Sequence, residues 1–355
     1  MYKLRFPLLV SCLWLAATLG YAQSTQLDLP RPSQHATVSQ TVGVTNITVN
    51  YHRPLANGRK VWGGLVPYGQ VWRAGANENT TITFSTPVTV EGQPLAAGTY
   101  GLHMIPDENE WTIIFSNMHT AWGSFSYDQK EDALRVKVKP QTTTDLHNAL
   151  VYDFDQLDPN STVVTMSWDK VAVPIKVAVN LQQTVEASLN NQLRGLSQYT
   201  WDAWNDAATY LVDNKMDLNL ALKDIDKSIQ NEERFENLMT KAQILDAMGQ
   251  KDQATVARNK ALSMGNPQQL YFYARQLLIR DKKQAEAFAI FRDIDKKYPD
   301  NWLAHAGMGR VYCGEGNYSK ATEQMKLALA VAPDAGKPSV ESLIKRLEAK
   351  EDINK

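Results

Sequence analysis

The spacing of apolar side chains divides the chain into two parts. In the first part, Ile47, Val49 and Tyr51 alternate with polar neighbours, which is the period of two expected of a half-buried strand. Similar short runs recur at residues 81–85, 88–90, 99–105, 111–116, 134–139, 149–156, 162–168 and 171–179. Turn-forming residues separate them at 91–92, 106–109, 158–160 and 169–170. Because no helical pattern interrupts these runs, they predict an antiparallel sandwich or barrel, and we expect a β-sandwich over residues 34–180.

The second part of the chain has a helical period that begins at residues 185–193. Ala221, Ala254, Ala287 and Ala321 recur at intervals of 33, 33 and 34 residues. A fixed period in this range is typical of stacked helical hairpins, in which small alanines let two helices approach closely. We therefore predict an α-solenoid over residues 181–355, with about four repeats in a curved array. A polar capping helix is expected at residues 339–351.

The N-terminus has the pattern of a secretory signal peptide. Lys3 and Arg5 precede an apolar run at residues 6–19, and small residues follow it up to Ala22. The apolar run is too short for a membrane-spanning helix. We expect a signal peptide over residues 1–22, with cleavage after Ala22, and therefore export to the periplasm or cell envelope.

An alternative at the N-terminus is a lipoprotein signal that ends at Cys12. Few apolar residues precede Cys12 and more follow it, so this cleavage would cut the signal's core in half. Residues 23–33 are polar, contain two prolines, and are expected to form a flexible lead-in. After cleavage at Ala22 only Cys313 remains, which excludes an intrachain disulfide and suggests a buried core residue. No other apolar segment is long enough to span a bilayer.

Composition and charge narrow the possible partners. The 355 residues are 43% hydrophobic and 21% charged, which is enough for two globular domains. A net charge of −1 and a pI of about 6.6 provide no basic field for nucleic acid or anionic membranes, and we expect neither partner. The histidines are scattered, and the serine-nucleophile motif G-x-S-x-G does not occur, so we expect no metal, no cofactor and no catalytic residues.

The candidate binding site is the long loop within residues 51–85, together with one later tryptophan. Loops with fixed arginines and aromatics are frequent binding sites on rigid scaffolds. Arginine suits carboxylate and phosphate, and tryptophan stacks on sugar rings, so the pattern predicts a glycan or small anionic ligand. The residues that would bind it are Arg53, Arg59, Trp62, Trp72, Arg73, Asn77, Glu78 and Trp122.

Other interpretations of these residues stay open. Glu78 can pair with an arginine in a structural network whose core holds the tryptophans. Glu78 with His103 or Asp132 can instead form the carboxylate-based site of an envelope glycan hydrolase, although their spacing does not show that they meet. A third possibility is a β domain that only stabilises the helices.

The helical repeats contain aromatic residues with two possible roles. Trp302, His305, Tyr271 and Tyr273 can line a concave groove for a peptide or can pack between helices. We expect the helical array to contact a protein partner in either case.

Two resemblances support this division. The N-terminal part resembles a family of exported bacterial proteins known only as a domain of unknown function, over roughly residues 34–180. The motifs that carry the resemblance are YHRP at 51–54, GR at 58–59, WGGLVP at 62–67, VWR at 71–73, GANE at 75–78, AGTY at 97–100, WTII at 111–114, WG at 122–123 and YD at 127–128, followed by Asp132 and Arg135. Residues 201–334 resemble degenerate tetratricopeptide repeats, through Gly309, Tyr312, Ala321, Ala328 and Pro333 in the last copy. The first resemblance implies no activity, and the second implies protein contacts.

Overall fold

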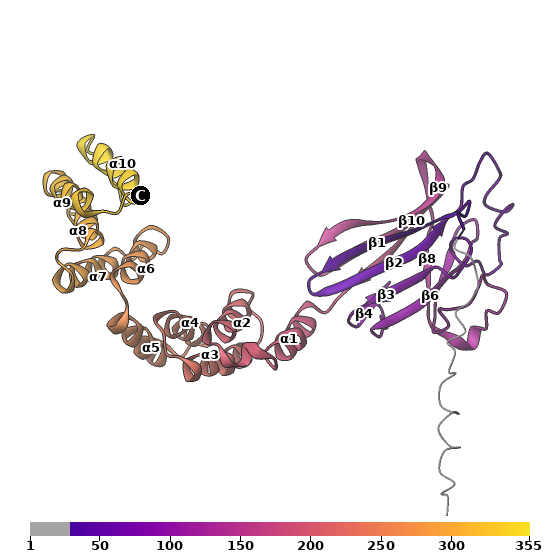
Figure 1. The fold of residues 1–355 in the computed structure, drawn as a ribbon, viewed down its shortest axis with the longest axis horizontal. Coiled ribbons are helices and arrows are strands. Elements are labelled where there is room, and N and C mark those ends of the chain that lie inside the picture. The colour runs from indigo at the N-terminus through magenta and orange to yellow at the C-terminus, as the bar shows by residue number, and fades with distance from the viewer. Residues whose placement is uncertain (1–28) are drawn as a thin grey trace, which may run out of the picture. The chain divides into compact units, whose positions relative to one another are not determined.

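The computed structural model describes residues 29–355. The expected signal peptide at residues 1–22, its cleavage after Ala22 and the alternative lipidation at Cys12 lie outside the described residues. The chain forms two compact units that divide between Thr184 and Val185, and Figure 1 shows strands in the first unit and helices in the second.

The first unit contains two antiparallel sheets. Its strands are β1 (Gln34–Val42), β2 (Thr45–Arg53), β3 (Thr81–Phe84), β4 (Val88–Val90), β5 (Gln93–Leu95), β6 (Gly98–Ile105), β7 (Trp111–Ser116), β8 (Asp132–Val138), β9 (Gln141–Asp158) and β10 (Ser161–Ala178). One sheet has the order β1-β2-β3-β6-β7-β8, and the other has the order β5-β4-β10-β9. Side chains from both sheets form one apolar core, in which Leu102 and Ile113 join Val164 and Ile175. The predicted β-sandwich is therefore confirmed.

Two features of the sandwich differ from the pattern in the sequence. The first strand, β1, was not expected, because its residues are mostly polar and exposed; it pairs with β2 along its whole length, from Gln34 opposite Arg53 to Val42 opposite Thr45. The expected turn at 169–170 is wrong. Asp169 has a φ of 53° and lies at a register shift inside the continuous strand β10, which makes it a bulge and not a hairpin.

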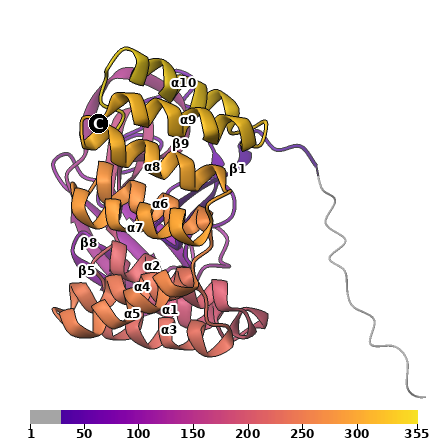
Figure 2. The same cartoon turned by 90° about the vertical axis from the view of Figure 1, so that its left-hand side faces the viewer.

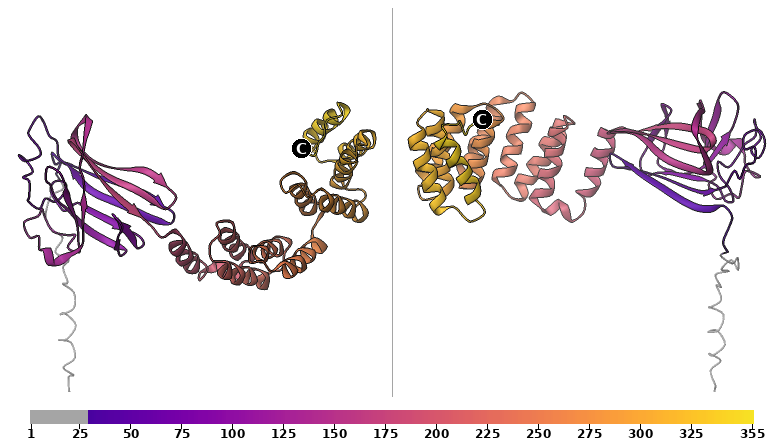
Figure 3. Two further views of the ribbon diagram at one scale, coloured as in Figure 1. Left: turned by 180° about the vertical axis from the view of Figure 1, so that it is seen from behind. Right: turned by 90° about the horizontal axis from the view of Figure 1, so that it is seen from above.

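The second unit consists of antiparallel helical hairpins. Its helices are α1 (Leu181–Gln192), which begins in the first unit, α2 (Trp201–Asp213), α3 (Leu218–Asn231), α4 (Phe235–Ala247), α5 (Lys251–Met264), α6 (Pro267–Ile279), α7 (Gln284–Lys297), α8 (Trp302–Gly314), α9 (Tyr318–Val331) and α10 (Lys337–Glu348). Figures 2 and 3 show that the hairpins follow one another in chain order. The four recurring alanines lie on α3, α5, α7 and α9, and each is 0% exposed. They permit the close helix approach that the period predicted.

The apolar core of the helical unit is divided. One cluster is built mainly from α2, α3 and α4, with Leu211, Ile225 and Ile244, and another extends from α6 to Ile353. At the junction, Phe235 of α4 and Leu262 of α5 are only partly buried where they pack against the second cluster. The stack of hairpins is therefore less tightly joined between α5 and α6 than within either half.

The end of the chain closes the second cluster. Ile353 is buried, and its carbonyl accepts a 2.6 Å hydrogen bond from Arg310 Nη1 of α8. Cys313 is buried beside it, as expected for a core cysteine. Across residues 29–355, no helix combines the length and the apolar character needed to cross a membrane.

Candidate functional site

The long loop between β2 and β3 is held firmly to the sandwich. Trp72 and Met104 of β6 exchange two backbone hydrogen bonds, each of 2.8 Å. The Ala74 carbonyl accepts hydrogen bonds from Thr80 Oγ1 at 3.1 Å and from Tyr152 Oη at 2.9 Å. The backbone on both sides of Arg73 is thus fixed before any ligand arrives.

Two of the predicted arginines donate hydrogen bonds to backbone carbonyls. Arg53 Nε donates to the Leu150 carbonyl at 3.0 Å. Arg59 donates from Nε to the Ala56 carbonyl at 3.0 Å and from Nη2 to the Leu55 carbonyl at 2.6 Å. These guanidinium groups satisfy backbone carbonyls, which is a structural role.

The loop tryptophans form part of an aromatic cluster in the core. Trp62 is 7% exposed, and its ring lies 4.7 Å from the Trp111 ring and 5.7 Å from the Trp168 ring. Trp72 stacks on Trp168 at 5.9 Å and donates from Nε1 to the Gly75 carbonyl at 3.1 Å. Since neighbouring rings cover Trp62, this side chain contributes packing energy and not a ligand platform.

Glu78 pairs with the segment that precedes β1. Arg31 Nη1 lies 2.5 Å from Glu78 Oε1, and His52 Nε2 lies 3.5 Å from Glu78 Oε2. Asn77 supports the same contact, because its Nδ2 donates to the Ser33 carbonyl at 3.2 Å. The hydrogen bond from Arg31 lowers the pKa of Glu78, and burial lowers the pKa of His52. At neutral pH the carboxylate is charged and the imidazole is neutral.

An open hollow of about 500 Å³ borders this ion pair, lined by Arg31, His35, His52, Glu78 and residues of the segment before β1. Glu78 is paired with Arg31 and His52, and neither His103 nor Asp132 is among its described contacts. In the described part of the chain, no cluster of three or more His, Cys, Asp or Glu side chains is arranged to hold a metal ion. The surroundings of Glu78 are those of an ion-paired carboxylate.

Buried polar atoms without a protein hydrogen-bond partner concentrate in the loop. Among the described residues there are five such atoms, and four of them are Trp62 Nε1, Arg73 Nε, Glu78 Oε2 and Asn79 Oδ1. Native proteins satisfy most buried polar atoms, so this concentration sets the loop apart from the rest of the described residues. Arg73 stands out because burial alone lowers its pKa and no carboxylate among residues 29–355 pairs with it.

The surface next to Arg73 is aromatic and exposed. Trp122 is 59% exposed and stacks at 6.1 Å, with an interplanar angle of 14°, on Phe125, which is 85% exposed. A backbone bridge joins Trp122 to Glu78. Gly123, with a φ of +72°, lies between the two rings in sequence and near Arg73 Nη1. Trp122 and Arg73 are therefore the predicted residues that remain available to a ligand.

A polar network fixes the segment that carries these aromatics. His103 of β6 is buried, and its Nδ1 lies 3.2 Å from Ser124 Oγ. Tyr127 Oη donates to the Asp132 carboxylate, whose second partner is the Arg135 guanidinium. Burial lowers the pKa of His103 to about 4, although the nearby Asp132 charge opposes this shift. His103 and Asp132 were expected only as partners of Glu78; a histidine inside the apolar strand 98–105 was the signal for this network.

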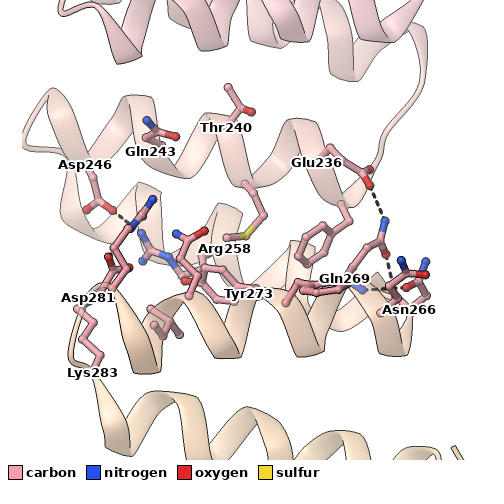
Figure 4. A pocket seen from close by; sticks show the side chains of 17 residues that line it. Glu236, Thr240, Gln243, Asp246, Arg258, Asn266, Gln269, Tyr273, Asp281 and Lys283 are labelled. Carbon is pink, nitrogen blue, oxygen red and sulfur yellow. Dashed lines mark hydrogen bonds and ion pairs between the residues drawn. The ribbon is translucent and has the colours of Figure 1, made fainter. Parts of the chain in front are cut away.

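The helical unit carries a groove of about 790 Å³ between α4 and α6. Figure 4 shows Glu236, Thr240, Gln243 and Asp246 on one wall and Asn266, Gln269 and Tyr273 on the other. Phe272, which the sequence analysis missed, also lines the groove and is 51% exposed. Phe272 therefore adds an exposed aromatic ring to the groove.

The four aromatic or histidine residues considered for a groove separate in the structure. Tyr273 lines the groove, whereas Tyr271 is buried and its ring packs 5.5 Å from the Phe291 ring. His305 Nδ1 lies 3.1 Å from Gln324 Oε1 of α9, and Trp302 packs against the second core cluster. These three residues therefore belong to helix packing.

Charged groups in the groove neutralise one another. Three acidic and three basic side chains line it. Arg258 pairs with Asp246, Arg280 Nε lies 2.8 Å from Asp281 Oδ1, and Gln269 Nε2 donates to Glu236 at 2.6 Å. The groove consequently has no net formal charge and presents apolar, amide and charged groups.

Comparisons with known proteins agree with the division of the chain. Residues 33–177 match the family model described as "Protein of unknown function (DUF2911)", which confirms the resemblance of the N-terminal domain. None of the curated proteins matches the sequence.

Three solved structures are similar to part of the chain. The APC/C hetero-tetramer Cut9-Hcn1 has a TM-score of 0.31 and 14% identity, and the match covers 48% of this chain and 33% of that chain. YrrB, described as a TPR protein with an unusual peptide-binding site, has a TM-score of 0.28 and 15% identity over 45% of this chain and 82% of its own. A tetratricopeptide repeat protein from Parabacteroides merdae ATCC 43184 has a TM-score of 0.29 and 15% identity over 48% of this chain and 69% of its own. The chain thus spans about a third of the length of the first of these structures.

Proposed function

We propose that this chain is an exported binding and scaffolding protein of the cell envelope. The family of its first domain has no assigned activity. Its helical repeats hold a protein partner, and its β domain presents the surface around Arg73, Glu78 and Trp122 to a ligand. Export is supported by the charged start and short apolar run of the N-terminal sequence.

The groove between α4 and α6 carries the proposal for a protein partner. Carboxamides contribute much of its lining, namely Gln243, Asn266, Gln268, Gln269 and Gln276. A carboxamide both donates and accepts, so it matches the donors and acceptors of an extended peptide backbone. Phe272 and Met239 offer apolar surface for a side chain of that peptide. Because the groove has no net charge, we propose an uncharged, extended polypeptide segment as its occupant.

The position of the groove supports the same partner. It lies at the junction where the core of the helical unit is divided, between the hairpin α4/α5 and the hairpin α6/α7. A bound segment that contacts both walls would join the two halves. Its volume falls within the range of about 300–1,000 Å³ that is usual for ligand sites.

The surroundings of Glu78 fit a role in ligand binding better than a role in glycan hydrolysis. A glycan hydrolase needs a second carboxylate beside the first, whereas the described ion-pair partner of Glu78 is Arg31, with the His52 imidazole 3.5 Å away. A purely structural β domain explains Arg53, Arg59 and Trp62. It does not explain why Arg73 lacks an ion-pair partner among residues 29–355 or why Trp122 is exposed.

Peptide selection tests the groove. A library of random twelve-residue peptides is selected on the chain from Gln23 onward, and fluorescence polarisation measures the affinity of the selected peptides. Phe272→Ala combined with Gln276→Ala should weaken binding at least tenfold. The matched control Val256→Ala, at an exposed position on α5 outside the groove, should leave affinity unchanged. Failure to select any peptide, or equal binding to both variants, would exclude the groove as the partner site.

A further inference from the structure

Arg73 has no ion-pair partner among residues 29–355, although the backbone on both sides of it is fixed. Its neighbours Trp72 and Ala74 are fixed by backbone and side-chain hydrogen bonds, and its own Nε is buried without a hydrogen-bond acceptor. A partly buried charge without a partner is costly, and most folds avoid it. Other arginines of this region are already engaged, since Arg31 pairs with Glu78 and Arg135 pairs with Asp132.

The Arg73 guanidinium and the exposed aromatic surface both lie next to Gly123. A Cβ added to Gly123 would lie 2.9 Å from Phe125 Cε2 and 3.7 Å from Arg73 Nη1. The arginine head and the Phe125 ring therefore both lie next to Gly123, and a side chain at this position would collide with the Phe125 ring. The φ of +72° at this position also favours glycine.

The aromatic surface next to Gly123 is exposed. Trp122 and Phe125 lie nearly parallel, and both are more than half exposed. Large rings that are exposed without a packing role are typical of binding surfaces. Flat rings of this kind pack well against the apolar face of a sugar ring. Ser124 lies between them in sequence and provides a hydroxyl, which the buried His103 holds at 3.2 Å.

We propose that Arg73, Trp122, Gly123 and Phe125 form a binding site for a sugar ring that bears a carboxylate. The guanidinium binds the carboxylate with two parallel hydrogen bonds, and the aromatic pair packs against the ring. A single free arginine matches one negative charge, whereas a polyphosphate would need several free cations. This inference rests on the β-domain part of the proposed function and names its ligand class.

Calorimetry with glucuronate tests the site, and glucose provides the same ring without the charge. Acetate provides the carboxylate alone, and an oligogalacturonate tests whether the protein binds a charged sugar within a polymer. Wild-type protein should bind glucuronate at least tenfold more tightly than glucose or acetate. The binding should weaken as sodium chloride is added, because salt screens the contact between guanidinium and carboxylate.

Three variants locate the binding. Arg73→Lys keeps the charge but loses the planar fork, and Trp122→Ala removes the exposed ring, so each should weaken glucuronate binding at least tenfold. Leu146→Ala, at an exposed position on β9, should bind as the wild type does.

Three outcomes would overturn the proposal: no binding of glucuronate, equal binding of glucose, or unchanged binding by Arg73→Lys. The peptide affinity of the same variants is measured in parallel. Because those substitutions leave the α4/α6 groove intact, loss of the sugar site and loss of the peptide site are observed separately.

Discussion

Arg31 and Glu78 form an ion pair at 2.5 Å, although 47 residues separate them in the chain. The pair attaches the segment before β1 to the loop that follows β2. We predict that Arg31→Ala raises the pKa of Glu78 toward the usual range of a glutamate, because the hydrogen bond from Arg31 is the main cause of the lowered pKa. Carbon-13 NMR of the Glu78 carboxyl group during a pH titration measures this.

The free energy of unfolding should change little in Arg31→Ala. Both side chains are more than a third exposed, and exposed ion pairs contribute about 0–1 kcal/mol. A Glu78 pKa that does not change in Arg31→Ala would show that the two groups are not paired in solution. Lys60→Ala, in the same loop, provides the control.

His103 should make the β domain less stable in acid. Its pKa is about 4 in the fold and about 6.5 in the unfolded chain, so the unfolded state takes up a proton first as the pH falls. The β domain therefore has its full free energy of unfolding above pH 6.5. Proton uptake by the unfolded state lowers this free energy by roughly 3 kcal/mol between pH 6.5 and about 4. Native-state hydrogen exchange of the β6 amides at several pH values measures this loss.

The variant His103→Gln isolates the histidine. A glutamine does not titrate, so the loss of β6 protection between pH 6.5 and 4 should become shallower than in the wild type. An identical slope in both proteins would assign the acid sensitivity to other groups. The network partner Ser124 gives a second comparison, since Ser124→Ala removes a hydrogen bond and keeps the titrating imidazole.

Asp224 should weaken the helical unit at neutral pH. It is buried on α3, and burial raises its pKa to about 6. The pKa of Asp224 is higher in the fold than in the unfolded chain. Its contribution to the free energy of unfolding is therefore fully present below the unfolded pKa of about 3.8 and is lost as the pH rises through 6. Asp224→Asn should therefore raise the free energy of unfolding at pH 7.5 by about 1–3 kcal/mol.

Circular dichroism at 222 nm during urea unfolding tests the Asp224 prediction. At pH 4 the gain from Asp224→Asn should disappear, because the wild-type carboxyl is then protonated in the fold. A gain of equal size at both pH values would mean that charge is not the cause. Asp226→Asn, at an exposed position on the same helix, is the matched control.

The last residues should stabilise the second half of the helical unit. Arg310 is buried and donates to the Ile353 carbonyl and to Tyr271 Oη, and Cys313 Sγ contacts the Ile353 amide at 3.5 Å. Deleting residues 352–355 leaves the guanidinium without its carbonyl partner and exposes the thiol. We predict a loss of about 2–4 kcal/mol in the free energy of unfolding.

Two measurements check the deletion. Urea unfolding gives the loss of stability, and the rate at which a maleimide labels Cys313 gives its exposure. The deletion should speed labelling at least tenfold, while Lys355→Ala should change neither value. Slow labelling of the shortened chain would contradict a protective role for these residues.

The local patterns of the sequence determined the class of each half. Alternation in residues 47–51 predicts β2, and the alanine period from 221 to 321 predicts the second helix of each hairpin. These features depend on neighbouring residues or on a fixed spacing, which the chain displays directly. The sequence pattern did not predict the strand β1 or the bulge at Asp169, because the pairing of both is set by partner strands.

The loop at residues 51–85 was identified as a site from its composition, but only the tertiary structure separated its residues by role. Trp62 became core because Trp111 and Trp168, distant in sequence, cover its ring. Arg53 donates to the carbonyl of Leu150, which is 97 residues away, and Arg135 pairs with Asp132, whereas no carboxylate among the described residues pairs with Arg73. Whether a charged side chain is paired depends on what surrounds it in three dimensions, and a sequence lists the groups without their distances.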